Sequence, residues 1–364
     1  MDFKFIPFDE TRRPAWDAFV AANPHAWVGH DSACIDFERS LGHESFSHLI
    51  LDERGAVVGV TPLFFVSYAR ARLFKFKALV TGTSLRAAPL ADAQMPPKTR
   101  RDFWRAWAAW ARAEAAARGV DEIRVGFPHF IGAERVFDFY EFSPLREFGF
   151  VDIPNLTMLK DLAAADGDMC ASFDKHCRNS MRKALAAGAE WVAVTDRDQW
   201  LAFEELNRQT FAEEAADAYS RRTLEIIWDR FVARGLAHVA ALRHEGRHLC
   251  ASVRAGNKNS EYNWLLFNER PRTLKGATNL HICRDLEDMR ARGVRWCELG
   301  SMEFDDPRQR GIADFKRSFG GRVQTSMDCK LCLSPLKAAS AEFLQALAKR
   351  LRPPRQDSAP SHAD

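Results

Sequence analysis

Two neighbouring stretches decide the fold, Arg295-Trp-Cys-Glu-Leu-Gly-Ser301 and Gly311-Ile-Ala-Asp-Phe-Lys-Arg-Ser-Phe-Gly-Gly321, and a polar loop joins them. The first is short, largely apolar and closed by Gly-Ser, which is typical of a buried strand that ends in a turn. In the second, Phe315 and Phe319 stand four residues apart, so both lie on one face of a short helix and can anchor it to a core. Lys316 is then held beside a packed face, and we expect the strand, loop and helix to position it.

The composition predicts a folded protein of two domains. The chain has 364 residues, of which 46% are hydrophobic and 28% charged, and this is enough apolar surface for two packed cores. Because 52 basic residues face 49 acidic ones, the net charge is only +3. A charge this close to neutral speaks against nucleic-acid binding through the overall field of the protein and against an extensive tRNA footprint, while a small footprint stays open.

The N-terminal sequence and the apolar runs indicate a cytoplasmic protein. Residues 1–10 carry acidic side chains and contain no apolar segment of signal-peptide length. The longest apolar run, residues 56–66, is interrupted by Gly59 and Pro62 and is shorter than the ~20 residues of a membrane-spanning helix. We expect a cytoplasmic location, with peripheral contact at the inner membrane surface as the alternative.

The eight cysteines do not predict a metal site. They are scattered singly except in Cys329-Lys-Leu-Cys332, and no second ligand pair at zinc-finger or zinc-ribbon spacing follows. In a strand, residues three apart point to opposite faces. We therefore interpret Cys329 and Cys332 as buried strand residues and expect no metal.

The order of predicted elements occurs twice along the chain. Each half contains a strand, two helices, a three-stranded antiparallel meander, a helix, a strand, a short helix and a last strand, with strands 151–161 and 323–333 closing the halves. The predicted units are an N-terminal domain (1–162), a C-terminal domain with the transfer site (163–333), an amphipathic tail helix (334–352) and a disordered tail (353–364). Leu336 and Phe343 share the apolar face of the tail helix, which we expect to dock on the second domain; membrane-surface contact is the alternative.

The lysine-bearing segment and a second motif resemble one protein family. The pattern Gly-x-x-x-Phe-Lys-x-x-Phe-Gly-Gly after a strand and loop is similar to the close of the FemAB-like, BioF2-like branch of the GNAT acyltransferase superfamily. Arg178-Asn-Ser-Met-Arg-Lys-Ala184 matches the helix with which FemAB-like proteins open their second domain. The resemblance implies an α+β fold of tandem GNAT-like domains, each a mixed, mostly antiparallel sheet flanked by helices.

Basic residues of that second motif are candidates for phosphate binding. Lys175, Arg178 and Arg182 recur at helical spacing and share one face. Arginine binds phosphate oxygens through two donors at once, so the face suits a diphosphate or polyphosphate. The competing interpretation is an ordinary solvated helix face.

The resemblance also implies a groove for an acyl donor. In a GNAT fold the strand that contains Tyr262 would splay from strand 296–299, and we assign Tyr262 to substrate binding. Acetyl-CoA enzymes follow that strand with a glycine-rich pyrophosphate loop, from which Arg272-Thr-Leu-Lys-Gly-Ala277 departs. FemAB-like proteins also lack this loop. Arg272 and Lys275 remain candidates for binding a phosphate by charge.

Acyl transfer needs a donor to the developing oxyanion and a base. By resemblance, Lys316 of the Phe-Lys pair is the oxyanion donor and Phe315 contacts the substrate. Glu303, Asp305 and Asp306, on the preceding loop, are candidates for the base, and Glu303 is the one we assign; the competing interpretation is that these are ordinary solvated loop residues. No tightly bound cofactor is expected beyond an acyl donor, which could be acyl-CoA, an acyl carrier protein or aminoacyl-tRNA.

The predicted function is acyl or aminoacyl transfer to an amine or hydroxyl of a cell-envelope or polysaccharide precursor, by a monomer. The acceptor would be a small molecule or a sugar linked to a lipid or nucleotide. The alternative is a non-catalytic protein with a degenerate GNAT fold that binds an anionic precursor.

Overall fold

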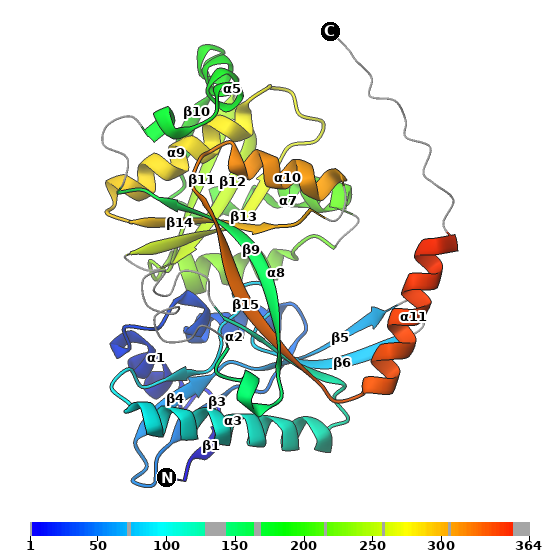
Figure 1. Ribbon diagram of the computed structural model, residues 1–364. Helices are drawn as coiled ribbons and strands as arrows, with labels where there is room; N and C mark the ends of the chain where they lie inside the picture. The colour runs from blue at the N-terminus through cyan, green and yellow to red at the C-terminus, as the bar shows by residue number, and fades with distance from the viewer. Residues whose placement is uncertain are drawn as a thin grey trace.

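The computed structural model describes residues 2–70, 74–127, 143–163, 169–214, 217–256, 259–304 and 307–351. Two units lie one above the other and are joined by two long strands (Figure 1). The predicted disordered tail, residues 353–364, lies outside the described residues.

The first unit consists of a long helix, several shorter helices and two groups of strands. Its helices are α1 (Arg13–Ala22), the 3-10 helix η1 (Val28–His30), α2 (Ser32–Ser40), α3 (Pro97–Ala117) and the 3-10 helix η2 (Arg146–Phe148). Its strands are β1 (Lys4–Pro7), β2 (Glu44–Ser45), β3 (His48–Leu51), β4 (Val57–Thr61), β5 (Phe64–Arg70), β6 (Phe74–Val80), β7 (Leu90–Ala91) and β8 (Glu122–Gly126). Four of them, β1, β3, β4 and β7, form a small separate sheet.

The second unit has helices on both faces of its strands. Its helices are η3 (Met169–Ser172, 3-10), α5 (Lys175–Ala186), α6 (Arg197–Leu201), α7 (Glu204–Glu214), α8 (Arg221–Ile226), the π-helical η4 (Ile227–Val232), α9 (Ala277–Ala291) and α10 (Pro307–Arg317). Its strands are β10 (Glu190–Ala193), β11 (Ala237–His244), β12 (Arg247–Gly256), β13 (Ser260–Asn268) and β14 (Trp296–Met302).

Two long strands, β9 (Val151–Asp161) and β15 (Arg322–Cys332), make the sheet continuous across both units. The eleven strands run in the order β10-β11-β12-β13-β14-β9-β15-β8-β6-β5-β2. The expectation that β9 closes the first half and β15 the second is therefore wrong, because β9 pairs with β14 and β15 pairs with β8. The predicted boundary between residues 162 and 163 does not separate two independent sheets.

Burial explains why the last strands are exchanged. Met158 of β9 packs into a core cluster of the second unit, whereas Cys329 and Leu331 of β15 pack into the main core of the first. β9, from the first half of the sequence, thus contributes to the core of the second unit. β15, from the second half, contributes to the core of the first. The α+β fold class with mixed, mostly antiparallel sheets is confirmed.

The two units also meet directly, through an apolar core with a charged rim. Phe37 of α2 contacts Trp264 of β13 with ring centroids 4.9 Å apart, and the indole Nε1 of Trp264 donates to Ser84 Oγ at 2.7 Å. At the rim, Arg234 forms a two-donor ion pair with Asp31, with distances of 2.7 and 3.0 Å. These contacts fix the units relative to one another.

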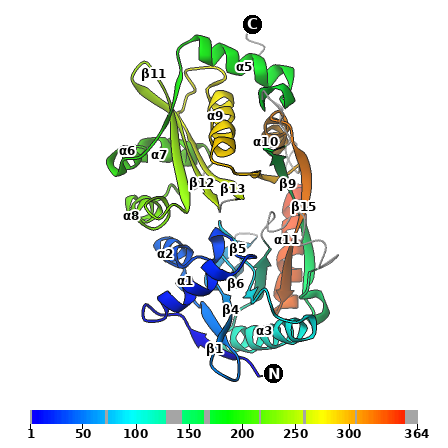
Figure 2. The same ribbon diagram turned by 90° about the vertical axis from the view of Figure 1, so that its left-hand side faces the viewer.

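The tail helix is present as α11 (Pro335–Leu351), but it does not dock on the second unit. Lys337 Nζ lies 2.7 Å from Asp121 Oδ2 and 4.8 Å from the ring centroid of Phe76, so the helix packs along the first unit (Figures 1 and 2). The expected docking face is exposed, since Leu336 is 86% and Phe343 68% accessible. The reason is that β15, which α11 follows, ends beside β8. No helix among the described residues is long and apolar enough to cross a membrane.

The prediction that Cys329 and Cys332 are both buried is correct for Cys329 only. Cys329 is fully buried, while Cys332 at the end of β15 is exposed. The two thiols therefore face different surroundings, as the strand spacing predicts, but Cys332 is not a core residue.

Candidate active site

The strands β13 and β14 run parallel and then separate. They pair only from Ser260 with Trp296 to Tyr262 with Glu298, after which β13 continues to Asn268 and β14 to Met302. This opening leaves room between the two strands for an extended ligand that pairs with backbone groups. The expected splay at Tyr262 is thus present.

Lys316 projects from α10 to this opening. Its Nζ donates to the backbone carbonyl of Ser301 at 2.6 Å. A Cβ placed on Gly300 would lie 3.1 Å from Lys316 Nζ and would push the ammonium away slightly, and the φ of +89° is itself strained for any residue with a Cβ. The rings of Phe315 and Phe319 meet edge to face with centroids 5.1 Å apart and hold the helix against the core.

The surroundings of Lys316 make it a weaker base than an ordinary lysine. Burial lowers the pKa of Lys316 to about 8, and the carboxylates of Glu298 and Glu303 partly offset this by favouring the ammonium. Near neutral pH the ammonium is therefore the main form, and it is held in a partly desolvated place. Such a donor is suited to stabilising an oxyanion.

Tyr262 and Glu298 complete the polar end of the opening. A Cβ on Gly300 would lie 3.7 Å from the Tyr262 hydroxyl, so this hydroxyl and the Lys316 ammonium both lie beside Gly300. Burial, followed by the nearby Glu298, raises the pKa of Tyr262 far above its usual range, so the phenol remains neutral and can donate a hydrogen bond. Glu298 is itself buried and accepts from Thr157 Oγ1 at 2.7 Å.

A cavity of about 320 Å³ continues from this point between β13, α9 and α10. Its apolar wall consists of Leu266, Ile282, Leu299, Ile312, Phe315 and Phe319. Its basic side chains are Arg270, Arg272, Arg308 and Lys316. Asn263 also lines it, and its buried Oδ1 has no hydrogen-bond partner among the described residues. An unsatisfied buried acceptor is costly, so this oxygen is suited to a ligand N–H.

The predicted phosphate-binding residues separate into two groups. Arg272 lies in the cavity wall, whereas Lys275 is exposed just before α9 and outside it. Lys175, Arg178 and Arg182 are on α5 and do not line the cavity. A phosphate-binding role for them stays a prediction.

The α5 side chains have local structural contacts. Arg178 donates to the carbonyl oxygens of Phe173 and Ala171, which ties the helix to the segment before it. Arg182 donates to Asn179 Oδ1 at 3.2 Å on the exposed face. α5 also covers the start of α9, where a Cβ on Gly276 would clash with the carbonyl of Ser180. That glycine is required by helix packing.

The predicted base, Glu303, is exposed just after β14 and does not line the cavity, and the alternatives Asp305 and Asp306 lie outside the described residues. It is near enough to act on the charge of Lys316. Sequence reasoning missed Glu298, Arg270, Arg308 and Asn263. The only signal for Glu298 was a single acidic residue within an otherwise apolar strand.

The splayed parallel pair, the lysine-bearing helix and the cavity together form the candidate active site. Residues 171–317 match the model of the acetyltransferase (GNAT) domain, so the second unit is a GNAT domain. The resemblance of the chain to the FemAB-like branch is confirmed at the level of the fold.

Three solved structures share this tandem arrangement. FemX has a TM-score of 0.66 and 14% identity, with 94% of this chain and 100% of that chain covered. The C-terminal domain of a putative lysylphosphatidylglycerol synthetase from Agrobacterium fabrum has a TM-score of 0.58 and 14% identity, with 92% and 96% covered. A tandem GNAT protein from the clavulanic acid biosynthesis pathway has a TM-score of 0.55 and 16% identity, with 91% and 98% covered.

At these identities the similarity shows a shared fold. No curated protein matches this sequence significantly. The tandem GNAT architecture therefore follows from structural similarity, and the acyltransferase class from the matched domain and the site.

Proposed function

We propose that this protein transfers an acyl or aminoacyl group to an amine or hydroxyl of a cell-envelope precursor. The observation that carries the proposal is the position of the Lys316 ammonium, beside Gly300 where β13 and β14 separate and at the wall of a cavity of about 320 Å³. A donor lying in the cavity would bring its carbonyl to this ammonium.

The chemistry follows from the groups at the opening. The acceptor nitrogen or oxygen attacks the donor carbonyl carbon, and the carbonyl oxygen becomes an oxyanion that Lys316 stabilises by a charge-assisted hydrogen bond. When the tetrahedral intermediate collapses, the bond to the leaving group breaks, the Tyr262 phenol gives its proton to the leaving group, and the phenolate then regains a proton from water. The proton of the acceptor passes through water to the exposed carboxylate of Glu303.

The donor is a phosphate-bearing carrier in this proposal. Arg270, Arg272 and Arg308 contribute to the cavity wall and suit phosphate oxygens, while the apolar wall suits an acyl chain. The buried Asn263 Oδ1 would accept from a donor N–H. Acyl-CoA, acyl carrier protein and aminoacyl-tRNA all carry both a phosphate and an N–H group, so the three remain candidates.

The names of similar structures support the acceptor class in different ways. One similar protein is a putative lysylphosphatidylglycerol synthetase, named for a lipid, and another belongs to clavulanic acid biosynthesis, which concerns a small molecule. We favour an acceptor linked to a lipid or nucleotide, including a polysaccharide precursor, bound by a monomer with peripheral membrane contact.

The test is a transfer assay with labelled donors. The purified protein is incubated with acyl-CoA, acyl carrier protein or aminoacyl-tRNA and a panel of amine and hydroxyl acceptors, beside Lys316→Met and the matched surface control Lys98→Met. Turnover by the wild type and by Lys98→Met, but not by Lys316→Met, supports the proposal. Tight binding of an anionic precursor without turnover by any donor would favour the non-catalytic alternative.

A further inference from the structure

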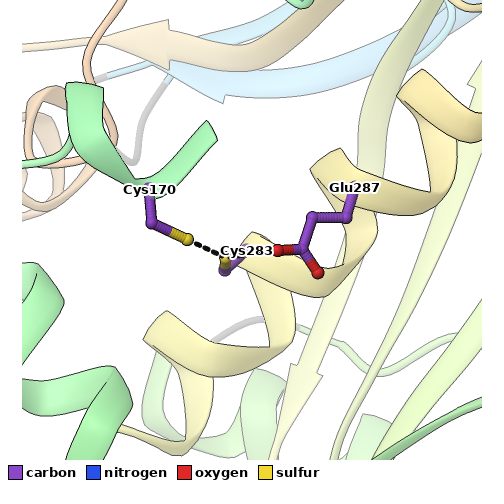
Figure 3. A group of neighbouring side chains, drawn as sticks. All are labelled: Cys170, Cys283 and Glu287. Carbon is purple, nitrogen blue, oxygen red and sulfur yellow. Dashed lines mark hydrogen bonds between the residues drawn. The ribbon is translucent and has the colours of Figure 1, made fainter. Parts of the chain in front are cut away.

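Two thiols and a carboxylate lie close together, and none of the three residues lines the cavity. Cys170 Sγ and Cys283 Sγ lie 3.0 Å apart, and Cys283 Sγ lies 3.7 Å from Glu287 Oε1 (Figure 3). One ligand atom from each of the three residues lies within 4.8 Å of those of the other two. Neither the proposed reaction nor the predicted motifs use this cluster.

The cluster is built by two elements that are distant in sequence. Cys283 and Glu287 are four residues apart on α9 and therefore share one helical face. Cys170 comes from η3 and points toward that face (Figure 3). Cys283 is buried, while Cys170 and Glu287 are partly accessible, so a water molecule can reach the cluster from outside.

We propose that Cys170, Cys283 and Glu287 bind a thiophilic divalent cation of the Zn²⁺ type, with water as the fourth ligand. With Zn–S distances of about 2.3 Å and Zn–O distances of about 2.0 to 2.2 Å, a tetrahedral site places two sulfurs about 3.8 Å apart and a sulfur and oxygen about 3.5 Å apart. The observed Cys170 Sγ–Cys283 Sγ distance of 3.0 Å and Cys283 Sγ–Glu287 Oε1 distance of 3.7 Å differ from these by less than about 1 Å, and the third pair, Cys170 with Glu287, lies within 4.8 Å. Side-chain rotation alone can supply that change.

The charges around the cluster fit a bound dication. Two thiolates and a carboxylate around a dication leave one net negative charge, and two cations stand close by. Arg284 Nη1 donates to the other Glu287 oxygen, Oε2, at 2.6 Å and so fixes the carboxylate, as outer partners of metal ligands commonly do. The Lys160 ammonium acts electrostatically on both cysteines.

A bound ion would connect structural elements that lie next to the donor cavity. Ile282, the neighbour of Cys283, lines the cavity. On the other side, Ser172 of η3 accepts from Lys160 Nζ at 2.8 Å, and the same ammonium donates to the carbonyl of Phe319 at 2.9 Å. Phe319 also lines the cavity. The ion therefore links η3 to α9 and, through Lys160, to the end of α10.

The test measures metal binding directly and does not depend on transferase activity. The full-length protein, purified under reducing conditions, is stripped with a chelator and titrated with Zn²⁺ and with Co²⁺. We expect one equivalent of metal, a rise in melting temperature on addition of Zn²⁺, and cobalt absorption with thiolate charge-transfer bands. Cys170→Ser should lose the charge-transfer intensity and the melting shift.

Two further variants separate metal binding from simple destabilisation. Arg284→Gln, which removes only the outer partner, should weaken metal affinity by about 10- to 100-fold and keep the cobalt spectrum. The matched control Cys332→Ser, an exposed thiol on β15, should behave as the wild type. Because each variant is compared with and without metal, a general loss of stability does not imitate the result.

Two outcomes overturn the proposal. One is a wild-type protein whose melting temperature is unaffected by Zn²⁺ and whose cobalt spectrum lacks thiolate bands. The other is a Cys170–Cys283 disulfide that forms in non-reducing buffer while the reduced protein takes up no metal, which would assign the two thiols to a redox pair.

Discussion

Both units contain a parallel strand pair of the same kind, yet only one pair opens into a site. In the first unit β6 and β8 pair from Ala78 with Glu122 to Val80 with Arg124, which matches the three-residue pairing of β13 with β14. After β6 the chain stays hydrogen-bonded to its partner strand, β8. Thr81 N donates to the carbonyl of Arg124 at 3.2 Å, and Gly126 N donates to Thr81 Oγ1 at 2.9 Å.

A buried carboxylate keeps the first pair closed. Glu38 is 2% exposed and accepts from Thr83 N at 2.6 Å and from Thr83 Oγ1 at 3.0 Å. His43 Nδ1 lies 2.6 Å from its other oxygen. The loop after β6 is therefore tied to α2 and to β8 by these hydrogen bonds. Equivalent strands support chemistry only where the following chain leaves them apart, which is why fold alone does not define function.

The strongest test of this comparison is the removal of the Lys316 charge. Lys316→Met keeps the aliphatic stem and removes the oxyanion donor, so we expect turnover to fall on the order of 100- to 1000-fold with a small change in stability. Steady-state kinetics with the accepted donor measure this loss. Full turnover in Lys316→Met would reduce the Phe-Lys pair to a folding feature and remove the main difference between the units.

Low pH should reduce the free energy of unfolding, because a buried histidine of the first unit must then become charged. His30 is fully buried, its Nδ1 accepts from Trp27 N at 3.1 Å, and its Nε2 faces the carbonyl of Ala88 at 2.9 Å. Burial lowers the pKa of His30 from 6.5 to about 4. The unfolded chain therefore binds more protons between these values, and the stabilisation, complete above pH 6.5, is lost as the pH falls.

The expected loss is about 3 kcal/mol in the free energy of unfolding by pH 4, from the pKa difference at 1.36 kcal/mol per unit. Urea unfolding at pH 7 and at pH 4 measures it, and His30→Gln should show a correspondingly smaller acid loss. If wild type and His30→Gln lose stability equally, His30 is not the group responsible.

Two glycines with positive φ, one in each unit, allow the units to be compared. Gly300 has φ +89° beside Lys316, and Gly82 has φ +101° in the closed loop of the first unit. Alanine is strained at both, and we expect each variant to lose about 1 kcal/mol of stability. Only in Gly300→Ala does the new Cβ displace a reacting group, so turnover should fall about tenfold or more there, because a slightly misplaced catalytic group is costly. Equal kinetic loss in Gly82→Ala would show that the first unit also serves the reaction.

The smallest expected effect is on the pH profile. In the proposed mechanism Lys316 acts as an ammonium, and burial lowers its pKa to about 8. The rate should therefore fall above pH 8, approaching tenfold per pH unit. In Lys316→Arg this alkaline fall should move beyond pH 10, because guanidinium stays protonated to about pH 12 or above. A rate that instead rises through pH 8 would indicate that the neutral amine acts as a base.

The sequence alone determined the features that local patterns encode. The spacing of Phe315 and Phe319 predicted the helix that holds Lys316, and the alternation of strands and helices predicted the GNAT order of the second half. The tail helix α11 was also predicted from its periodicity. In each case the signal lies within one element or its immediate neighbours, where helical and strand periods constrain the chain directly.

Only the tertiary structure decided which distant segments meet. The exchange of β9 and β15, the docking of α11 on the first unit, and the meeting of Cys170 with Cys283 all join residues far apart in sequence. Glu298 lies at the candidate site because β13 and β14 separate beside it, and this separation is a feature of the tertiary structure. Periodicity shows that a strand or helix has a buried face, but several faces could cover it, and the packing of the whole chain selects among them.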